Sequence, residues 1–228
     1  MDRILLIESS GKVATVALAS DSRILAERQL PETRRHARDL ALRTSELLNE
    51  AGWKARDLTG VIVSIGPGSY TGLRVGVVSA KTLAYAIGCP LYGVPTFDAI
   101  AEAVPVQPAA LELIADALQG LVYCQRYAAE GEHWRTDQPL RIRSFAEWSS
   151  EVTPGTWVAG PAAGLARAIP GVIIADEHLH PTTTALLKVA QRVGERYRTD
   201  PMKLEPLYLR GSSAEEKRKA DGLASVET

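Results

Sequence analysis

The feature that most constrains the fold is a glycine-rich loop that joins an apolar run to a helical pattern. Residues Val61–Ile65 are largely apolar, Gly66–Gly72 contains three glycines and one proline, and the pattern that follows is helical to about Ile87. A short apolar run of this kind is typical of a strand that is covered on both faces. A strand, a glycine loop and a helix in this order predict one unit of an α/β fold.

Other segments continue the alternation of strands and helices. Residues 35–51 carry apolar side chains at helical spacing, with charged side chains mostly on the opposite face, and Gly52 follows where a left-handed C-cap is expected. Further helices are expected at 96–104, 164–169 and 183–198. Apolar runs predict strands at 4–7, 13–19, 24–30, 91–94, 111–115, 121–127, 157–159 and 172–175. This order predicts an α/β fold with two related lobes.

A change of pattern between two prolines divides the chain. Pro105 and Pro108 mark the expected boundary, so residues 1–104 are predicted to form an N-terminal lobe that carries the glycine loop. Residues 105–210 are expected to form a smaller C-terminal lobe. Residues 211–228 are rich in Glu, Lys and Arg and are predicted to be a disordered tail.

The charge balance argues against a protein that binds nucleic acid without help. The chain has 228 residues and a formal net charge of −1. Proteins that bind nucleic acid alone usually present a basic field, because contacts with phosphate dominate their affinity. Any contact with RNA is therefore expected to depend on a partner.

The cysteines and the N-terminus indicate a cytoplasmic protein. Cys89 and Cys124 form no C-x-x-C motif, and we expect both to be free, reduced thiols. The first residues, Met1–Ile4, lead directly into an expected strand, without the pattern of a secretory signal. No run reaches the roughly 18 apolar residues that a membrane span needs.

The glycine loop matches none of the three common catalytic or nucleotide-binding motifs. A P-loop would end in Gly-Lys-Ser or Gly-Lys-Thr, but Leu73 and Arg74 follow Gly72. A dinucleotide fingerprint would have an acidic residue at the end of the next strand, and the segment 91–94 has none. The spacing of a nucleophile elbow around Ser69 is also absent.

Three interpretations of the loop stay open. It could be only a tight turn from strand to helix, or it could shape a surface for another protein. In the third, backbone amides at the helix N-terminus would bind a phosphate or a nucleotide, with Glu8 at the end of the first strand holding a cation. The residues of this candidate phosphate site are Glu8, Gly66, Gly68, Ser69 and Gly72.

The helix behind the loop carries a small-residue stripe, Gly72, Gly76, Ala80 and Ala84, that repeats every four residues. Small side chains let another helix approach closely, so we expect a partner's helix to pack on the stripe, together with the 35–51 helix. Burial within the chain's own fold is the alternative. The predicted interface residues are Leu40, Thr44, Leu47, Leu48, Gly72, Leu73, Gly76, Val77, Ala80 and Ala84.

The histidines give no sign of a metal site. His36, His133, His178 and His180 do not form the H-x-x-x-H or H-E-x-x-H spacing that places two ligands on one helical face. We therefore expect no metal and assign no catalytic residue.

Several segments together resemble the TsaB (YeaZ-like) family. The resemblance extends over about residues 1 to 210 and is stronger in the first hundred. Its most specific part is the glycine-loop motif, which is typical of this family and of its catalytic relative TsaD. The matching segments are Ile4–Ser10, Gly66–Gly76, Asp116–Ala117, Val122–Tyr123 and Pro206–Arg210.

The resemblance implies an actin-like, sugar-kinase-type (ASKHA) fold, with two ribonuclease-H-like lobes of mixed β-sheet flanked by helices. It also implies a non-catalytic subunit that pairs with TsaD, and with the ATPase TsaE, to threonylcarbamoylate the adenosine beside the anticodon of tRNA. Contact with tRNA would occur only through the complex, and the chain alone could form a homodimer. No cofactor is firmly expected, while weak Mg-dependent binding of ATP or ADP stays open.

The chain departs from the family pattern around the expected cleft. Glu8 replaces an aspartate, Leu118 and Leu121 stand where an arginine and a glutamate are usual, and Gly160-Pro161-Ala162 replaces an acidic glycine turn. These losses of charge weaken the alternative function, a nucleotide-dependent phosphotransferase or ATPase that uses the cleft between the lobes.

Overall fold

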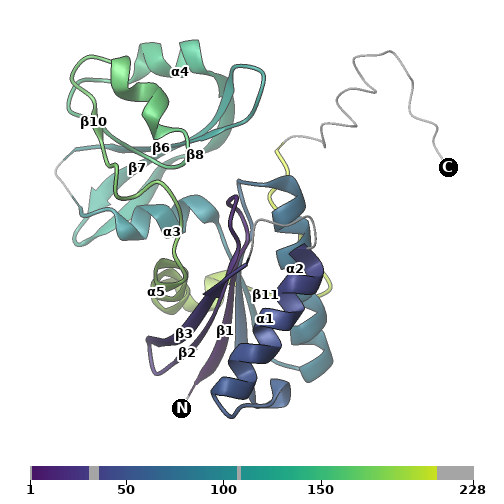
Figure 1. The fold of residues 1–228 in the computed structure, drawn as a ribbon. Coiled ribbons are helices and arrows are strands. Elements are labelled where there is room, and N and C mark those ends of the chain that lie inside the picture. Colours follow the sequence, from purple (N-terminus) through teal and green to yellow (C-terminus); the bar gives the residue numbers. More distant parts are fainter. Residues whose placement is uncertain (1, 31–35, 107–108, 210–228) are drawn as a thin grey trace, which may run out of the picture.

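The computed structural model describes residues 2–30, 36–106 and 109–209, and within them it contains two β-sheets flanked by helices (Figure 1). The first sheet has the strand order β11-β5-β4-β1-β2-β3. Strands β1, β4 and β5 are parallel, whereas β2, β3 and β11 pair in antiparallel fashion. The six strands are β1 (Arg3–Glu8), β2 (Thr15–Ser20), β3 (Arg23–Gln29), β4 (Gly60–Ser64), β5 (Leu91–Val94) and β11 (Arg198–Thr199).

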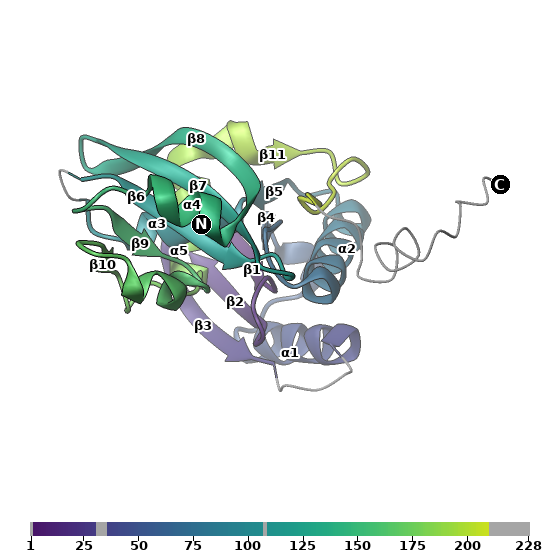
Figure 2. The same ribbon diagram turned by 90° about the horizontal axis from the view of Figure 1, so that it is seen from above.

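Helices cover both faces of the first sheet. On one face lie α1 (His36–Glu50) and α2 (Tyr70–Ile87), which are side by side in Figure 2. On the other face lie α5 (Thr183–Val193) and part of α3 (Thr96–Ala103). The short 3₁₀ segment η1 (Ala55–Asp57) links α1 to β4. The prediction of an α/β arrangement around the strand, glycine loop and helix is confirmed.

The alternation of side chains along β1 explains why the sheet needs both layers. Leu5 and Ile7 point into the core beneath α1 and α2, whereas Leu6 points into the core beneath α5. All three are at most 2% exposed. Successive side chains of a strand point to opposite faces, so a strand that is apolar at every position must be buried on both sides.

The second sheet has the order β10-β9-β6-β7-β8 and is also mixed. The capping-box helix α4 (Phe145–Glu151) and the 3₁₀ segment η2 (Ala163–Ala168) accompany it. Its strands are β6 (Leu111–Asp116), β7 (Leu121–Glu130), β8 (His133–Ser144), β9 (Trp157–Ala159) and β10 (Ile173–Ile174). The sequence analysis predicted neither β8 nor α4. The helix expected at 164–169 is 3₁₀, and the helix expected at 183–198 ends at Val193, where η3 (Gly194–Tyr197) follows.

Helix α3 belongs to the cores of both sheets. Phe97 and Ile100 pack with residues of the second sheet, such as Leu113, while Ala99 packs with α5 and the first sheet. Polar contacts add to this junction. The hydroxyl of Tyr127 on β7 donates to Asp98 Oδ1 over 2.6 Å.

The chain returns to the first lobe after the second sheet, which corrects the predicted division. Residues 183–209 were expected in the C-terminal lobe with 105–182. Instead α5 and β11 pack on or extend the first sheet, and Leu204 lies in its core. The segment predicted to be a disordered tail, 211–228, lies outside the described residues.

Candidate functional site

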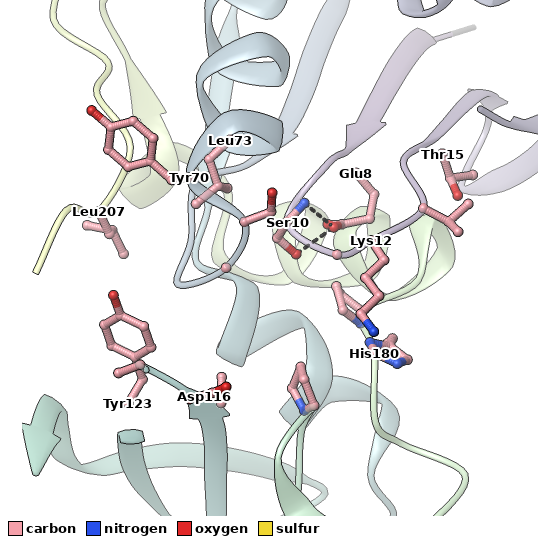
Figure 3. Close-up of a pocket in the computed structure, with 18 of the residues that line it drawn as sticks. Glu8, Ser10, Lys12, Thr15, Tyr70, Leu73, Asp116, Tyr123, His180 and Leu207 are labelled. Atoms are coloured by element: carbon pink, nitrogen blue, oxygen red, sulfur yellow. Dashed lines mark hydrogen bonds between the residues drawn. The ribbon is translucent and has the colours of Figure 1, made fainter. Parts of the chain in front are cut away.

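A cleft of about 920 Å³ lies between the two sheets. Its walls come from the β1–β2 turn, the start of α2, the end of β6 and the C-terminal segment (Figure 3). The side chains that give it its chemical character are Glu8, Lys12, Ser69, Tyr70, Asp116, Tyr123, His180, Leu207 and Tyr208. The cleft is therefore lined by residues that are widely separated in the sequence.

Glu8 is fixed at the end of β1 and is only 4% exposed. Its Oε1 accepts hydrogen bonds from the Ser10 amide, over 2.7 Å, and from the Ser10 hydroxyl, over 2.5 Å. Burial raises the pKa of the Glu8 carboxyl, and these hydrogen bonds offset part of the rise. Because Oε1 is engaged by its own turn, Glu8 forms part of the β1–β2 turn as well as the wall of the cleft, while its Oε2 is buried without a hydrogen-bond partner.

The glycine loop packs tightly on the same turn. The Ser69 amide donates to the Ser10 carbonyl oxygen over 2.7 Å. A Cβ atom on Gly68 would overlap the Ser10 carbonyl, and a Cβ atom on Gly72 would overlap the carbonyl of Ser9. The glycines are thus explained by the close approach of two backbone segments.

Only part of the phosphate site predicted from the sequence faces the cleft. Glu8, Gly68 and Ser69 line the cleft, but Gly66 and Gly72 do not. Within the loop, the amide of Gly66 donates to Thr96 Oγ1 and that of Gly72 donates to Ser69 Oγ. Amides that already donate within the chain are not available to an anion. The structure therefore favours the interpretation of the loop as a tight turn.

The small-residue stripe of α2 faces the chain's own sheet. Ala80 and Ala84 are completely buried, and a Cβ atom on Gly76 would overlap Ser9 Oγ and lie 3.4 Å from Ile7 Cγ2. The remaining predicted interface residues behave alike: Leu40, Leu47, Leu48, Leu73 and Val77 are buried in the same fold, and Thr44 Oγ1 donates to the Leu40 carbonyl. The face that carries the stripe packs on β4, β1 and the β1–β2 turn, which agrees with the alternative of burial within the chain's own fold.

The outer face of the α1–α2 pair has a different character. Away from the core, α1 exposes Leu42 at 49%, and α2 exposes Val78 at 59% and Tyr85 at 68%. Arg43 and Glu46 form an ion pair of 2.8 Å on α1. We call Leu42, Val78 and Tyr85 the outer patch. Sequence analysis missed it, although these residues alternate with the buried positions of the same helical pattern.

A second cluster of aromatic residues lies where the cleft opens. The rings of Tyr70 and Tyr208 are 5.0 Å apart, and the guanidinium of Arg74 lies 5.6 Å from the centre of the Tyr70 ring. Tyr123 approaches from the second sheet, with its hydroxyl directed across the cleft (Figure 3). We call Tyr70, Arg74, Tyr123 and Tyr208 the aromatic rim. The sequence analysis named the segments that contain these residues, but it did not predict that their side chains line one site.

The C-terminal segment is held at the edge of the cleft. The Lys81 ammonium on α2 donates to the Leu204 carbonyl over 2.8 Å. The Leu207 amide donates to the Ile65 carbonyl over 2.7 Å. These bonds fix the direction of the segment just before Tyr208, so its ring is placed against Tyr70.

Titratable groups in the described part of the chain form no metal site. No cluster of three or more His, Cys, Asp or Glu side chains occurs among the described residues. His180 lines the cleft beside Lys12 (Figure 3), while Asp116 Oδ1 accepts a hydrogen bond from the Leu118 amide. Within the same residues, no helix is both long and apolar enough to cross a membrane.

Similarity to known proteins now identifies the family. Residues 23–156 match the TsaD family, tRNA N6-adenosine threonylcarbamoyltransferase. The chain is 28% identical over 229 residues to the "tRNA threonylcarbamoyladenosine biosynthesis protein TsaB" of Escherichia coli, with 93% of this chain and 96% of that protein covered. It is 30% identical to an uncharacterised Mycobacterium bovis protein over 92% of this chain and 93% of that one. The chain belongs to the TsaB/YeaZ family.

A solved structure agrees with this family. A crystal structure from Pseudomonas aeruginosa, described as that of a protein similar to the peptidase YeaZ, superposes with a TM-score of 0.76 and 25% identity. The match covers 92% of this chain and all of that one. The predicted family and the ASKHA-type fold, with two mixed sheets flanked by helices, are both confirmed.

Proposed function

We propose that this TsaB/YeaZ family member is a non-catalytic, activating subunit in threonylcarbamoylation of the adenosine beside the anticodon of tRNA. The observation that carries the proposal is the similarity over nearly the whole chain to a protein named for tRNA threonylcarbamoyladenosine biosynthesis. In this role the chain pairs with a TsaD-like transferase and works with a TsaE-like ATPase in the cytoplasm. Contact with tRNA occurs in the complex.

The outer patch supports the pairing. Three large apolar side chains exposed on two adjacent helices are typical of a protein interface, because burying them against a partner removes apolar surface from water. The opposite faces of α1 and α2 are already buried in the core of the first sheet. We therefore assign the proposed interface to Leu42, Val78 and Tyr85, in place of the small-residue stripe. The same patch could hold a second copy of the chain when TsaD is absent.

The described cleft supports a role without its own phosphoryl transfer. Glu8 is hydrogen-bonded to Ser10, and the amides of Gly66, Ser69 and Gly72 donate within the chain. A phosphotransferase needs groups directed at a transferring phosphoryl group and its metal ion. Mg-dependent ATP turnover by the isolated chain that is lost on Glu8→Ala would support the alternative enzyme.

Reconstitution tests the proposal directly. A TsaD-like subunit and a TsaE-like ATPase are incubated with unmodified tRNA, threonine, bicarbonate, ATP and the enzyme that makes the threonylcarbamoyl adenylate, with and without this chain. Nucleosides are then measured by mass spectrometry. We expect modified adenosine only when the chain is present, and co-elution of the chain with the TsaD-like subunit on size exclusion. Equal modification without the chain would refute the activating role.

A further inference from the structure

The aromatic rim has the composition of a surface that stacks flat rings. Tyr208 is 44% exposed, so part of its ring remains open after it packs on Tyr70. Arg74, one helical turn after Tyr70, adds an exposed guanidinium beside the pair. Aromatic rings and guanidinium planes are the groups on which proteins stack unpaired nucleobases.

The charges around the rim agree with a nucleic-acid ligand. Among the described residues, no carboxylate lies within ion-pairing distance of Arg74 or of Lys12. Arg74 lies beside the rim and Lys12 lines the cleft. Cations that no carboxylate pairs with can neutralise phosphates on either side of a stacked base. A purely apolar peptide would offer no group of opposite charge to Arg74 or Lys12.

The rim is also preorganised. The bonds from Lys81 to Leu204 and from Leu207 to Ile65 fix the segment that carries Tyr208, and α2 fixes Tyr70 and Arg74. Tyr123 comes from the second sheet, so the rim contains rings from both lobes. A platform that is already ordered loses little conformational entropy when a base stacks on it.

We propose that the aromatic rim binds an unpaired nucleobase of RNA by stacking on Tyr208, whose ring Tyr70 supports, with Arg74 at the neighbouring phosphate. This inference rests on the proposed function, because that function supplies an RNA with an unpaired loop. The few cations available make the contact weak for the isolated chain, and the partner provides most of the phosphate contacts in the complex. The rim therefore positions a base and does not provide the main affinity.

The test uses the isolated full chain at low ionic strength, so it does not depend on pairing with another subunit. The probe is an RNA hairpin with one 2-aminopurine in its unpaired loop, whose fluorescence falls when the base stacks. We expect saturable quenching. Tyr208→Ala should weaken the affinity by about 5- to 150-fold, the range found for the loss of one base–aromatic stack. Tyr208→Phe, which keeps the ring, should bind as the unchanged chain does.

Two matched controls separate stacking from general effects. Leu25→Ala removes an exposed apolar side chain on β3, away from the rim, and should leave quenching unchanged. Arg74→Ala should reduce the slope of log affinity against log salt by about 0.7, as expected for one phosphate contact on a single strand. Arg56→Ala, an exposed arginine on η1, should not alter this slope.

Each contrary result overturns the proposal. Absence of quenching, or equal affinity for Tyr208→Ala and Leu25→Ala, would exclude a stacked base at the rim. Loss of co-elution with the TsaD-like subunit in Tyr208→Ala, with RNA affinity unchanged, would make the rim a protein interface. If circular dichroism shows that Tyr208→Ala is unfolded, the comparison of Arg74→Ala with Arg56→Ala decides. Failure of the pairing itself appears on size exclusion and leaves the RNA titration intact.

Discussion

The inner and outer faces of α2 differ in composition, burial and proposed use. The inner face is built from Gly76, Val77, Ala80 and Ala84, all buried in the chain's own core, where α2 contacts β4 and β1. The outer face exposes Val78 and Tyr85 and no comparable stripe of small residues. Small side chains at a spacing of four mark close packing, but they do not reveal whether the neighbour is internal or foreign. On this helix the neighbour is internal, and the partner surface is proposed for the opposite side.

The largest effect is expected when a long charged side chain is placed on the inner face of α2. We expect Gly76→Arg to unfold the chain, because even a Cβ atom would overlap Ser9 Oγ and the charge would be buried without a partner. A loss of more than about 4 kcal/mol in the free energy of unfolding is the expected scale. Circular dichroism and urea denaturation measure it.

The control for that variant is Thr82→Arg, at an exposed position of the same helix, which should fold normally. If Gly76→Arg instead folded with the stability of Thr82→Arg, the inner face would have room for a foreign helix, and the assignment of the two faces would have to be reversed.

The outer face gives the next largest effect, but on association and not on folding. Val78→Arg and Tyr85→Arg should change the free energy of unfolding by less than about 0.5 kcal/mol, since both positions are exposed. They should weaken pairing with the TsaD-like subunit by at least about 2 kcal/mol, or roughly thirtyfold in the dissociation constant. Analytical ultracentrifugation measures the pairing. Leu165→Arg, an exposed position on η2, should pair normally, and equal losses there would remove the outer patch from consideration.

The N-cap of α2 provides a test that does not distinguish the two faces, because it stabilises the start of the whole helix. Ser69 Oγ accepts a hydrogen bond from the Gly72 amide over 3.2 Å. Ser69→Ala should cost about 1 kcal/mol of stability, as is usual for loss of a cap. It should affect pairing less than Val78→Arg does. Thr71→Ala, at an exposed position in the same turn, serves as the control for denaturant midpoints. A Ser69→Ala chain as stable as Thr71→Ala would show that the cap contributes nothing.

The smallest expected effect is on the pH dependence of stability, and it comes from Glu8 at the end of β1. Burial raises the pKa of this carboxyl in the folded chain above its ordinary value of 4.5. The folded state therefore holds a proton that the unfolded state has already lost, and the free energy of unfolding falls as the pH rises from about 4.5 through the raised pKa. Glu8→Gln should flatten this decline. Urea denaturation across acidic to neutral pH checks it, and parallel curves for the two chains would contradict the prediction.

Much of the first lobe could be predicted from the sequence because its elements are strongly patterned. The apolar run before Gly66 is β4, and the helix predicted to extend to about Ile87 does end there, with Gly88 as a left-handed C-cap. Strand β8 was missed because most of its side chains are exposed and do not alternate, and the 7-residue α4 was too short to show helical spacing. Local patterns identify elements that bury one face, and they fail where an edge strand buries little.

The sites were harder to predict than the elements because their geometry depends on contacts between distant segments. Spacing alone could not decide which side of α2 faces the sheet, so the predicted interface fell on residues that are mostly buried within the chain's own fold. The glycines after β4 suggested an anion site, but the turn at Ser9 and Ser10 accounts for them. Tyr70 and Tyr208 come together only because the last described segment returns to the first lobe.

That return, together with α3, has a consequence for how the molecule can be divided. Because α3 contributes Phe97 and Ile100 to one core and Ala99 to the other, neither sheet has a hydrophobic interior that is complete without it. Cutting the chain near Pro105 would separate β6 from helix α3, which packs on it. The cut would also separate α5 from the strands of the first sheet that it covers. We therefore expect the two lobes to fold as one cooperative unit, and a fragment that ends at Val104 would lack α5, which covers one face of its sheet.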